Sequence, residues 1–286
     1  MKRFVHLNVH SAFSMLDGTA TVDTLAEVAA AAGMDTLALT DTDGMYGAVP
    51  FTRACERHGV RPIYGTELSE PFPGDRHKEK KFFDGRTLRR ATLLARDHDG
   101  YATICSIITQ RHLRKDFNWE QAVANLPESV FVLTGDEPLL RLRAAKRRVK
   151  AATRVEIRHF GGPDSIRRRE RLFSLADELG IRPVATNGVR LATADDYPVH
   201  RILSALRMNA TIGTVPSHAV SPPSACLVEP AEMHRRFSAH SESVLEAERI
   251  ARECGYKLDL ETRKLPCFPV PGGSDPYRYL RGITLQ

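Results

Sequence analysis

Imidazole and carboxylate side chains near the start of the chain have a spacing that could hold a metal ion. His6, Asn8 and His10 alternate along Phe4–Ser11, which has the pattern of a short β-strand. Residues two apart on a strand share one face, and neutral imidazole is the commonest nitrogen ligand of zinc-like cations. Asn8 weakens this prediction, because an amide carbonyl binds first-row metals poorly beside imidazole.

Polar residues also follow several later strand-like segments, at the point where each segment ends. They are Asp41-Thr42-Asp43, Glu67, Gly135-Asp136 and Asn187-Gly188-Val189-Arg190. In barrels built from parallel strands, functional side chains gather where strands end and the next loops begin. We therefore expect these residues to lie around one site.

Alternating strand-like and helix-like segments must position that site. The predicted strands are Val5–Val9, Thr36–Thr40, Arg61–Glu67, Ala91–Ala95, Val130–Leu133, Val155–His159 and Pro183–Thr186. The predicted helices between them are Val22–Ala32, Phe51–His58, Tyr101–Leu113, Leu139–Ala152 and Ser165–Leu179. Helices between strands favour parallel pairing by right-handed crossovers. About seven such units predict the α/β class and a distorted (β/α)7 TIM-like barrel.

The sequence changes character after residue 207. Residues 1–207 are predicted to form the barrel, with Pro71–Arg86 as an insertion. Residues 208–286 are predicted to form a small helical extension with a loop, short helices and a Pro-rich strip. The chain ends just after Pro276–Arg281, which resembles the first turn of a helix, so we expect a truncated chain or a split gene.

Composition limits the class of protein. A hydrophobic content of 42% and a charged content of 27% are ordinary for a soluble globular protein. An apolar run of about 18 residues and a secretory signal pattern are both absent from the sequence, which argues against a membrane partner. Five cysteines without a C-x-x-C pair indicate reduced thiols and a cytoplasmic location. The net charge of +6 is compatible with a polyanionic partner but does not require one.

Six basic residues lie opposite an apolar stripe on the predicted helix Leu139–Ala152. They are Arg141, Arg143, Lys146, Arg147, Arg148 and Lys150. The pattern predicts a solvated helix face. A contact with the DNA backbone is the alternative, since Arg and Lys bind phosphates without reading sequence.

Five motifs occur in an order that resembles one known family. They are residues 4–18, 38–48, 62–67, 92–101 and 184–190, followed by Phe268-Pro-Val-Pro271. Together they resemble the N-terminal PHP domain (polymerase and histidinol phosphatase) of the bacterial DNA polymerase III alpha subunit, a C-family DNA polymerase. The segments Asp43-Gly-Met-Tyr-Gly47 and Asn187-Gly-Val-Arg190 resemble the error-prone branch of this family.

The resemblance implies a seven-stranded barrel whose active members hold two or three metal ions and hydrolyse phosphate esters. His10, Asp17 and Glu67 match ligand positions of the family, and Asp136 stands where cysteine or histidine is usual. The other ligand positions carry residues that do not match the family pattern: Asn8, Thr42, Arg90, Gly188 and Arg190. The resemblance therefore implies a degenerate metal site.

Two arginines in place of ligands oppose a metal cluster. A guanidinium stays protonated at ordinary pH, and two of them repel a nearby divalent cation by several kcal/mol at an effective dielectric of about 20. We therefore predict no catalytic residue and no cofactor, or at most one weakly held zinc or manganese. Asp17 and Glu67 are expected to pair with Arg90 and Arg190 instead. Phosphate binding by the same two arginines is the alternative.

We therefore predict a non-catalytic PHP domain of an alpha-like DNA polymerase, with a structural role in DNA replication or translesion synthesis. Its expected partners are the palm and thumb domains of the parent nucleotidyltransferase. Two alternatives remain open: a metal-dependent phosphoesterase, acting as a 3'-5' exonuclease or small-phosphate hydrolase, and a free-standing phosphate- or nucleotide-binding module. His6 and His200 are predicted to be packed structural residues.

Overall fold

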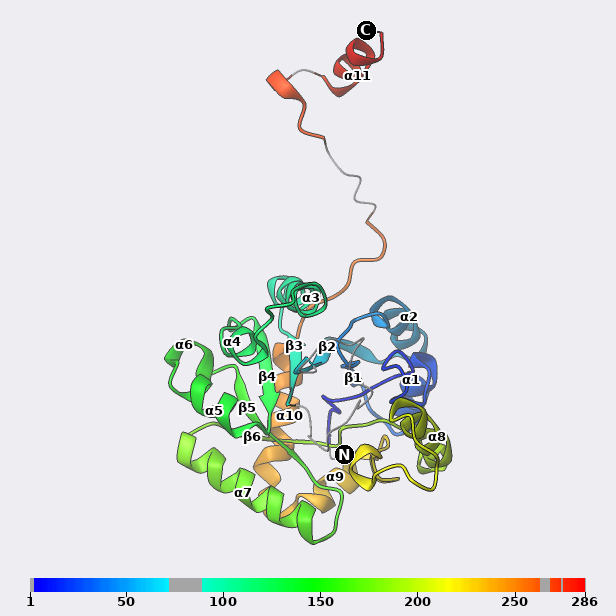
Figure 1. The fold of residues 1–286 in the computed structure, drawn as a ribbon, viewed down its shortest axis with the longest axis vertical. Coiled ribbons are helices and arrows are strands. Elements are labelled where there is room, and N and C mark those ends of the chain that lie inside the picture. Colours follow the sequence, from blue (N-terminus) through cyan, green and yellow to red (C-terminus); the bar gives the residue numbers. More distant parts are fainter. Residues whose placement is uncertain (1–2, 72–88, 263–267, 274, 286) are drawn as a thin grey trace.

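A curled six-stranded sheet forms the centre of the molecule (Figure 1). The computed structural model describes residues 3–71, 89–262, 268–273 and 275–285. The strands are β1 (Thr36–Leu39), β2 (Arg61–Ser69), β3 (Arg90–Ala95), β4 (Val130–Thr134), β5 (Thr153–Arg158) and β6 (Pro183–Thr186), and they pair in sequence order. Every predicted strand except the first is therefore confirmed, within a few residues at each end.

Helices surround the curled sheet (Figure 1). The helices that come before β6 in the chain are α1 (Val22–Ala31), α2 (Ala48–His58), α3 (His98–Leu113), α4 (Trp119–Ala124), α5 (Glu137–Ala144), α6 (Arg147–Lys150) and α7 (Pro163–Leu179). The later helices are α8 (Tyr197–Arg207), α9 (Pro230–Arg236), α10 (Ser241–Glu253) and α11 (Pro276–Thr284). Local signals set several ends: Thr21 caps α1 through its side chain, and Gly59 ends α2 with a φ of 68°.

The direction of β3 corrects the prediction of a fully parallel sheet. β3 runs antiparallel to both β2 and β4, whereas β1 with β2, β4 with β5 and β5 with β6 are parallel. A parallel neighbour needs a crossover connection, usually a helix. The segment between β2 and β3 shows no helical pattern in the sequence, and residues 72–88 of it, including most of the predicted insertion, lie outside the described residues.

The N-terminal segment lies between the two ends of the sheet. The backbone N–H groups of Ala38 and Thr40 donate to the carbonyls of His6 (3.1 Å) and Val9 (2.8 Å). On the other side, Val189 N–H donates to the Asn8 carbonyl and His10 N–H to the Val189 carbonyl, both at 2.9 Å. Val9 forms only an isolated bridge with Val189 and no regular strand. The α/β class is thus confirmed, while a complete seven-stranded barrel is not established.

The core continues beyond the barrel segment. Buried side chains of α9 and α10, including Met233, Val244 and Ile250, belong to the same apolar cluster as Val155 and Val184 of β5 and β6. Burying such side chains is the main stabilising term in folding. The proposed boundary at residue 207 stays a prediction. α11 lies away from the sheet and its helices (Figure 1).

Arg143 corrects the prediction of a fully solvated basic face. Its side chain is fully buried and donates to Thr153 Oγ1 (2.8 Å) and to the Val123 carbonyl (2.7 Å). Burial lowers the pKa of its guanidinium to about 10. A second helix, α6, begins after Lys146, where the sequence pattern had indicated one continuous helix. A long side chain that finds backbone acceptors can be buried, so helical spacing alone did not reveal its position.

Candidate functional site: an arginine–carboxylate cluster

Most of the predicted site residues converge at one edge of the sheet. Glu67 lies near the carboxyl end of β2, Arg158 ends β5, and Arg190 follows β6. Arg90 is the first residue of β3. Because β3 is antiparallel to its neighbours, its first residue lies at the edge where the parallel strands end. This strand reversal places Arg90 beside Glu67.

Glu67 is the centre of the cluster. Its Oε1 accepts from Arg90 Nη1 at 2.7 Å and from Arg190 Nη2 at 2.8 Å. Its Oε2 accepts from Arg158 Nη2 at 2.7 Å, and its side chain is fully buried. Burial alone would raise the pKa of this carboxyl, but the charges of Arg190 and Arg158 hold it well below its ordinary value. Glu67 is therefore an anion shared by three guanidinium groups.

Asp17 extends the cluster through Arg190. Its Oδ2 lies 2.8 Å from Arg190 Nε, and its Oδ1 pairs with Arg207 of α8. Burial opposes ionisation, yet the charges of Arg190 and Arg207 lower the pKa of Asp17 far below its ordinary value. One guanidinium thus bridges two buried carboxylates. The predicted pairing of Asp17 and Glu67 with Arg90 and Arg190 is observed.

Glu156 and Arg158 belong to the cluster although the sequence analysis missed both. Arg158 Nη2 lies 3.1 Å from Glu156 Oε2, and Thr186 Oγ1 donates to Glu156 Oε1 at 2.8 Å. The two residues are two positions apart at the end of β5, so they share one face. An opposite-charge pair at that spacing, at a predicted strand end, was a signal that could have identified them.

Asn8 serves as a hydrogen-bond donor to this cluster. Its amide nitrogen lies 3.0 Å from Glu67 Oε2, 3.1 Å from Glu156 Oε1 and 2.6 Å from Thr92 Oγ1. Its carbonyl oxygen lies 3.0 Å from His10 Nε2. An amide can donate to carboxylates where a neutral histidine would offer one N–H at most. Asn8 therefore suits a site in which it donates to carboxylates and does not bind a metal ion.

His10 uses both of its ring nitrogens within the protein. Because Asn8 Oδ1 only accepts, His10 Nε2 carries the proton, and Nδ1 accepts from the Thr42 hydroxyl at 3.2 Å. The Ser14 hydroxyl, 3.0 Å from Nδ1, donates to Asp41 Oδ1 at 2.7 Å. Burial and the charge of Arg190 lower the pKa of His10 well below its ordinary value. The imidazole is neutral, and its one lone pair is already engaged.

Asp136 does not contact this cluster. Its carboxylate caps α5 by accepting from Leu139 N–H at 2.9 Å, and it forms a two-point pair with Arg89 at 2.6 and 2.7 Å. The structure thus brings together His10, Asp17, Glu67, Arg90 and Arg190 but leaves Asp136 apart. Whether any of them binds a metal or a phosphate stays a prediction.

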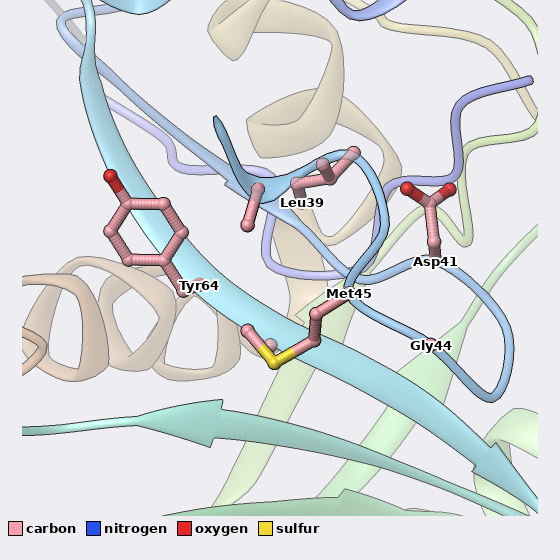
Figure 2. A pocket seen from close by; sticks show the side chains of 7 residues that line it. Leu39, Asp41, Gly44, Met45 and Tyr64 are labelled. Carbon is pink, nitrogen blue, oxygen red and sulfur yellow. The ribbon is translucent and has the colours of Figure 1, made fainter. Parts of the chain in front are cut away.

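The loop after β1 encloses a small pocket beside the cluster. Figure 2 shows Asp41 and Met45 on this loop and Tyr64 on β2, with the Asp41 carboxylate pointing away from Tyr64. The cavity has a volume of about 10 Å³, which is about the space of one water molecule. The Asp41 carboxylate accepts a hydrogen bond from Ser11 N–H at 2.7 Å. The pocket is too small for a substrate.

The donor set does not fit a multinuclear metal centre. Both oxygens of Glu67 accept from guanidinium groups, Asp17 pairs with two arginines, and His10 has no unused lone pair. Within the described ranges, no group of three or more His, Cys, Asp and Glu side chains is placed to hold a metal ion. Fixed positive charge occupies the space that a divalent cation would need.

Gly188 gives a test of how tightly this site is packed. Its φ is 51°, and an added Cβ would lie 3.0 Å from Arg158 Cδ and 3.1 Å from Arg158 Nε. We expect Gly188→Ala to lower the free energy of unfolding by about 2–3 kcal/mol. The added Cβ would displace Arg158 from its ion pairs, and alanine would also be strained at this positive φ. Urea unfolding measures the change.

Gly59→Ala is the matched control. Gly59 has a φ of 68°, and nothing lies within 4 Å of an added Cβ. This variant should lose only the backbone term, about 1 kcal/mol. Equal losses in the two variants would show that Arg158 yields freely and that the crowding argument is wrong.

Comparison with known proteins identifies the family. The profile of the PHP domain family matches residues 6–154. The chain belongs to the PHP domain family. This PHP domain is 28% identical to an error-prone DNA polymerase of Nocardia farcinica, over 99% of this chain and 30% of that protein. It is 26% identical to a DNA polymerase III subunit alpha of Halalkalibacterium halodurans, over 99% of this chain and 25% of that protein. It thus spans less than a third of the relatives it matches.

Solved structures similar to this PHP domain include a putative metal-dependent phosphoesterase from Bifidobacterium adolescentis. It is 16% identical, with a TM-score of 0.39, over 66% of this chain and 88% of that one. The predicted membership in the PHP family, with relatives among error-prone polymerases and DNA polymerase III alpha subunits, is confirmed by the family profile and the polymerase relatives.

Proposed function

We propose that this chain is a non-catalytic PHP domain of an alpha-like bacterial DNA polymerase, in which arginines take the place of the metal ions. The observation that carries the proposal is Glu67, a fully buried carboxylate held by Arg90, Arg158 and Arg190. In this reading the cluster holds the strand ends together electrostatically. The domain has a structural role in replication or translesion synthesis.

The pairing of every buried carboxylate of the cluster with arginine supports a structural role. Glu67, Asp17 and Glu156 face Arg90, Arg158, Arg190 and Arg207. Buried charges persist only when they are paired and hydrogen-bonded. A hydrolytic centre needs exposed metal-bound water, and these carboxylates have no oxygen left over to hold the metal.

The polymerase context is supported by the relatives. The chain matches polymerases over a quarter to a third of their length, so we infer that it works as one domain of a larger polymerase. Palm and thumb domains are the proposed partners, and the cytoplasm is the proposed location. None of the helices in the described part of the chain is long and apolar enough to cross a membrane.

Metal content and hydrolysis test the non-catalytic proposal. We expect purified protein, incubated with manganese or zinc and desalted, to hold much less than one equivalent of metal by elemental analysis. We also expect no hydrolysis of bis(p-nitrophenyl) phosphate above the protein-free rate. The site lacks the open metal position that activates water.

One combined result would contradict the non-catalytic proposal. Stoichiometric metal together with a turnover that His10→Ala abolishes would overturn the proposal and establish a phosphoesterase. His98→Ala is the control, since His98 is largely exposed and its recorded ion contact is with Asp99. A turnover that survives both substitutions would come from a contaminant and would leave the proposal intact.

A further inference from the structure

Two arginines of the cluster are open to solvent, although the carboxylate that they share is not. The side chains of Arg90 and Arg158 are 34% and 29% exposed, whereas Glu67 is fully buried. The other two carboxylates of the cluster, Glu156 and Asp17, are 6% and 9% exposed. The cluster therefore presents positive groups to solvent and keeps its negative groups buried.

Both guanidinium groups keep N–H donors that the carboxylates do not use. Arg90 binds Glu67 through Nη1 alone at 2.7 Å, so its Nε and Nη2 have no acceptor among the residues that the structure describes. Arg158 binds Glu67 through Nη2 and Glu156 through Nε and Nη2, which leaves its Nη1 without an acceptor in the same ranges. A guanidinium stays charged and only donates. Its unused N–H groups therefore bind water or an anion.

The unused donors belong to two groups that one carboxylate holds near each other. Arg90 Nη1 and Arg158 Nη2 bind the two different oxygens of Glu67. The Nε–Nη2 edge of Arg90 is a two-point donor that fits two oxygens of an oxyanion, and Arg158 Nη1 offers a third donor. Three donors match a tetrahedral oxyanion with three or more free oxygens, such as phosphate, better than a planar carboxylate with two.

The charges of the cluster also favour an anion. Its three paired carboxylates carry one charge fewer than its four arginines, Arg90, Arg158, Arg190 and Arg207. Asp41, the next buried carboxylate, accepts from the Ser11 and Ser14 hydroxyls and forms no ion pair with an arginine in the described part of the chain. An anion at the two exposed arginines would compensate the excess positive charge.

We propose that Arg90 and Arg158 together bind a small tetrahedral oxyanion of the phosphate class, without a metal ion. Arg190 has no part in this contact, because its Nε and Nη2 already bind Asp17 and Glu67 and its side chain is only 5% exposed. The inference deepens the proposed function by naming a ligand for the same cluster. It rests on that function in one respect, since it needs a cluster that holds no metal.

Isothermal titration calorimetry with inorganic phosphate, on the whole chain in buffer that contains EDTA, tests the proposal. We expect saturable binding of one phosphate per chain. Arg90→Lys and Arg158→Lys keep a positive charge beside Glu67 but remove the unused guanidinium donors. Each should weaken phosphate binding by about ten-fold, because a charge-assisted hydrogen bond is lost.

Arg89→Lys is the matched control. Arg89 precedes Arg90 in the chain, and Asp136 and Glu120 hold its guanidinium away from the cluster. This variant should change the affinity for phosphate by less than about two-fold, since neighbouring residues of a strand point to opposite faces. Circular dichroism and urea unfolding of each variant show that it is folded under the conditions of the titration.

The choice of anion tests the geometry of the contact. Acetate offers two oxygens and should bind about ten-fold more weakly than phosphate, because it leaves one donor unpaired. Thymidine monophosphate separates two sources of the same chemistry. An affinity equal to that of phosphate indicates a free anion, and a tighter one indicates the phosphate of a nucleotide.

Three results would overturn the inference. The first is the absence of saturable phosphate binding to the native chain. The second is an affinity that is the same in Arg90→Lys and Arg158→Lys as in Arg89→Lys, or the same for acetate as for phosphate, since the anion would then bind elsewhere or by charge alone. Both leave the proposed function standing. The third is binding that appears only after manganese is added, which would overturn the proposed function as well.

Discussion

Replacing Glu67 by glutamine is expected to lower the free energy of unfolding by about 3–5 kcal/mol. The substitution keeps the shape of the side chain but removes the anion that Arg90, Arg158 and Arg190 share. Breaking a buried ion pair costs this much because the opposite charge stays buried without compensation. Urea unfolding followed by far-UV circular dichroism measures the loss.

A double variant separates charge from packing. Glu67→Gln combined with Arg190→Met removes one of the uncompensated cations, and we expect it to be more stable than Glu67→Gln alone. Glu178→Gln is the surface control, since Glu178 pairs with Arg141 on an exposed face and should change stability by less than about 1 kcal/mol. A loss as small in Glu67→Gln as in this control would refute the electrostatic role of the cluster.

Acidification should destabilise the folded protein, because the buried His6 resists protonation. His6 is fully buried, and its Nε2 donates to the Val228 carbonyl at 3.0 Å, while its Nδ1 has no hydrogen-bond partner among the residues that the structure describes. Burial lowers the pKa of His6 from 6.5 to about 4. Between these values the unfolded chain binds the proton and the folded chain does not, so stability falls as the pH falls. The loss between pH 7.5 and 4.5 is expected to be about 2.5 kcal/mol from His6 alone.

The carboxylates extend this loss to lower pH. The pKa values of Asp17 and Glu67 are lowered in the folded state, chiefly by Arg190 acting against burial. Their contribution is complete above the unfolded value of about 4 and declines as the pH falls below it. The free energy of unfolding from urea titrations at constant ionic strength gives the profile.

Two variants check the assignment to His6. His6→Gln cannot titrate and should flatten the profile between pH 7.5 and 4.5 by about 2–3 kcal/mol, whatever its absolute stability. His98→Gln, at a position where the side chain is 72% exposed, should keep the native profile. An unchanged slope in His6→Gln would show that other groups cause the acid sensitivity.

Strand ends and the family motifs together were enough to predict much of the candidate site. His10, Glu67 and Arg190 follow predicted strands, Asp17 and Arg90 match positions of the family motifs, and the structure brings the five together. Asp136 was selected for the same reason, but it caps α5 and pairs with Arg89. A position at the end of a strand indicates that a side chain lies near that edge of the sheet. It does not indicate which neighbouring residue the side chain contacts.

The sequence by itself determined the α/β class, six of the seven predicted strands and the PHP family, because apolar periodicity and ordered motifs are local properties. Tertiary structure alone decided the reversal of β3, the burial of Arg143 and the ion pair of Arg158 with Glu67. Each depends on contacts between residues far apart in the chain. The energy of a charge is set by the partners that surround it, and distant segments supply those partners only after folding.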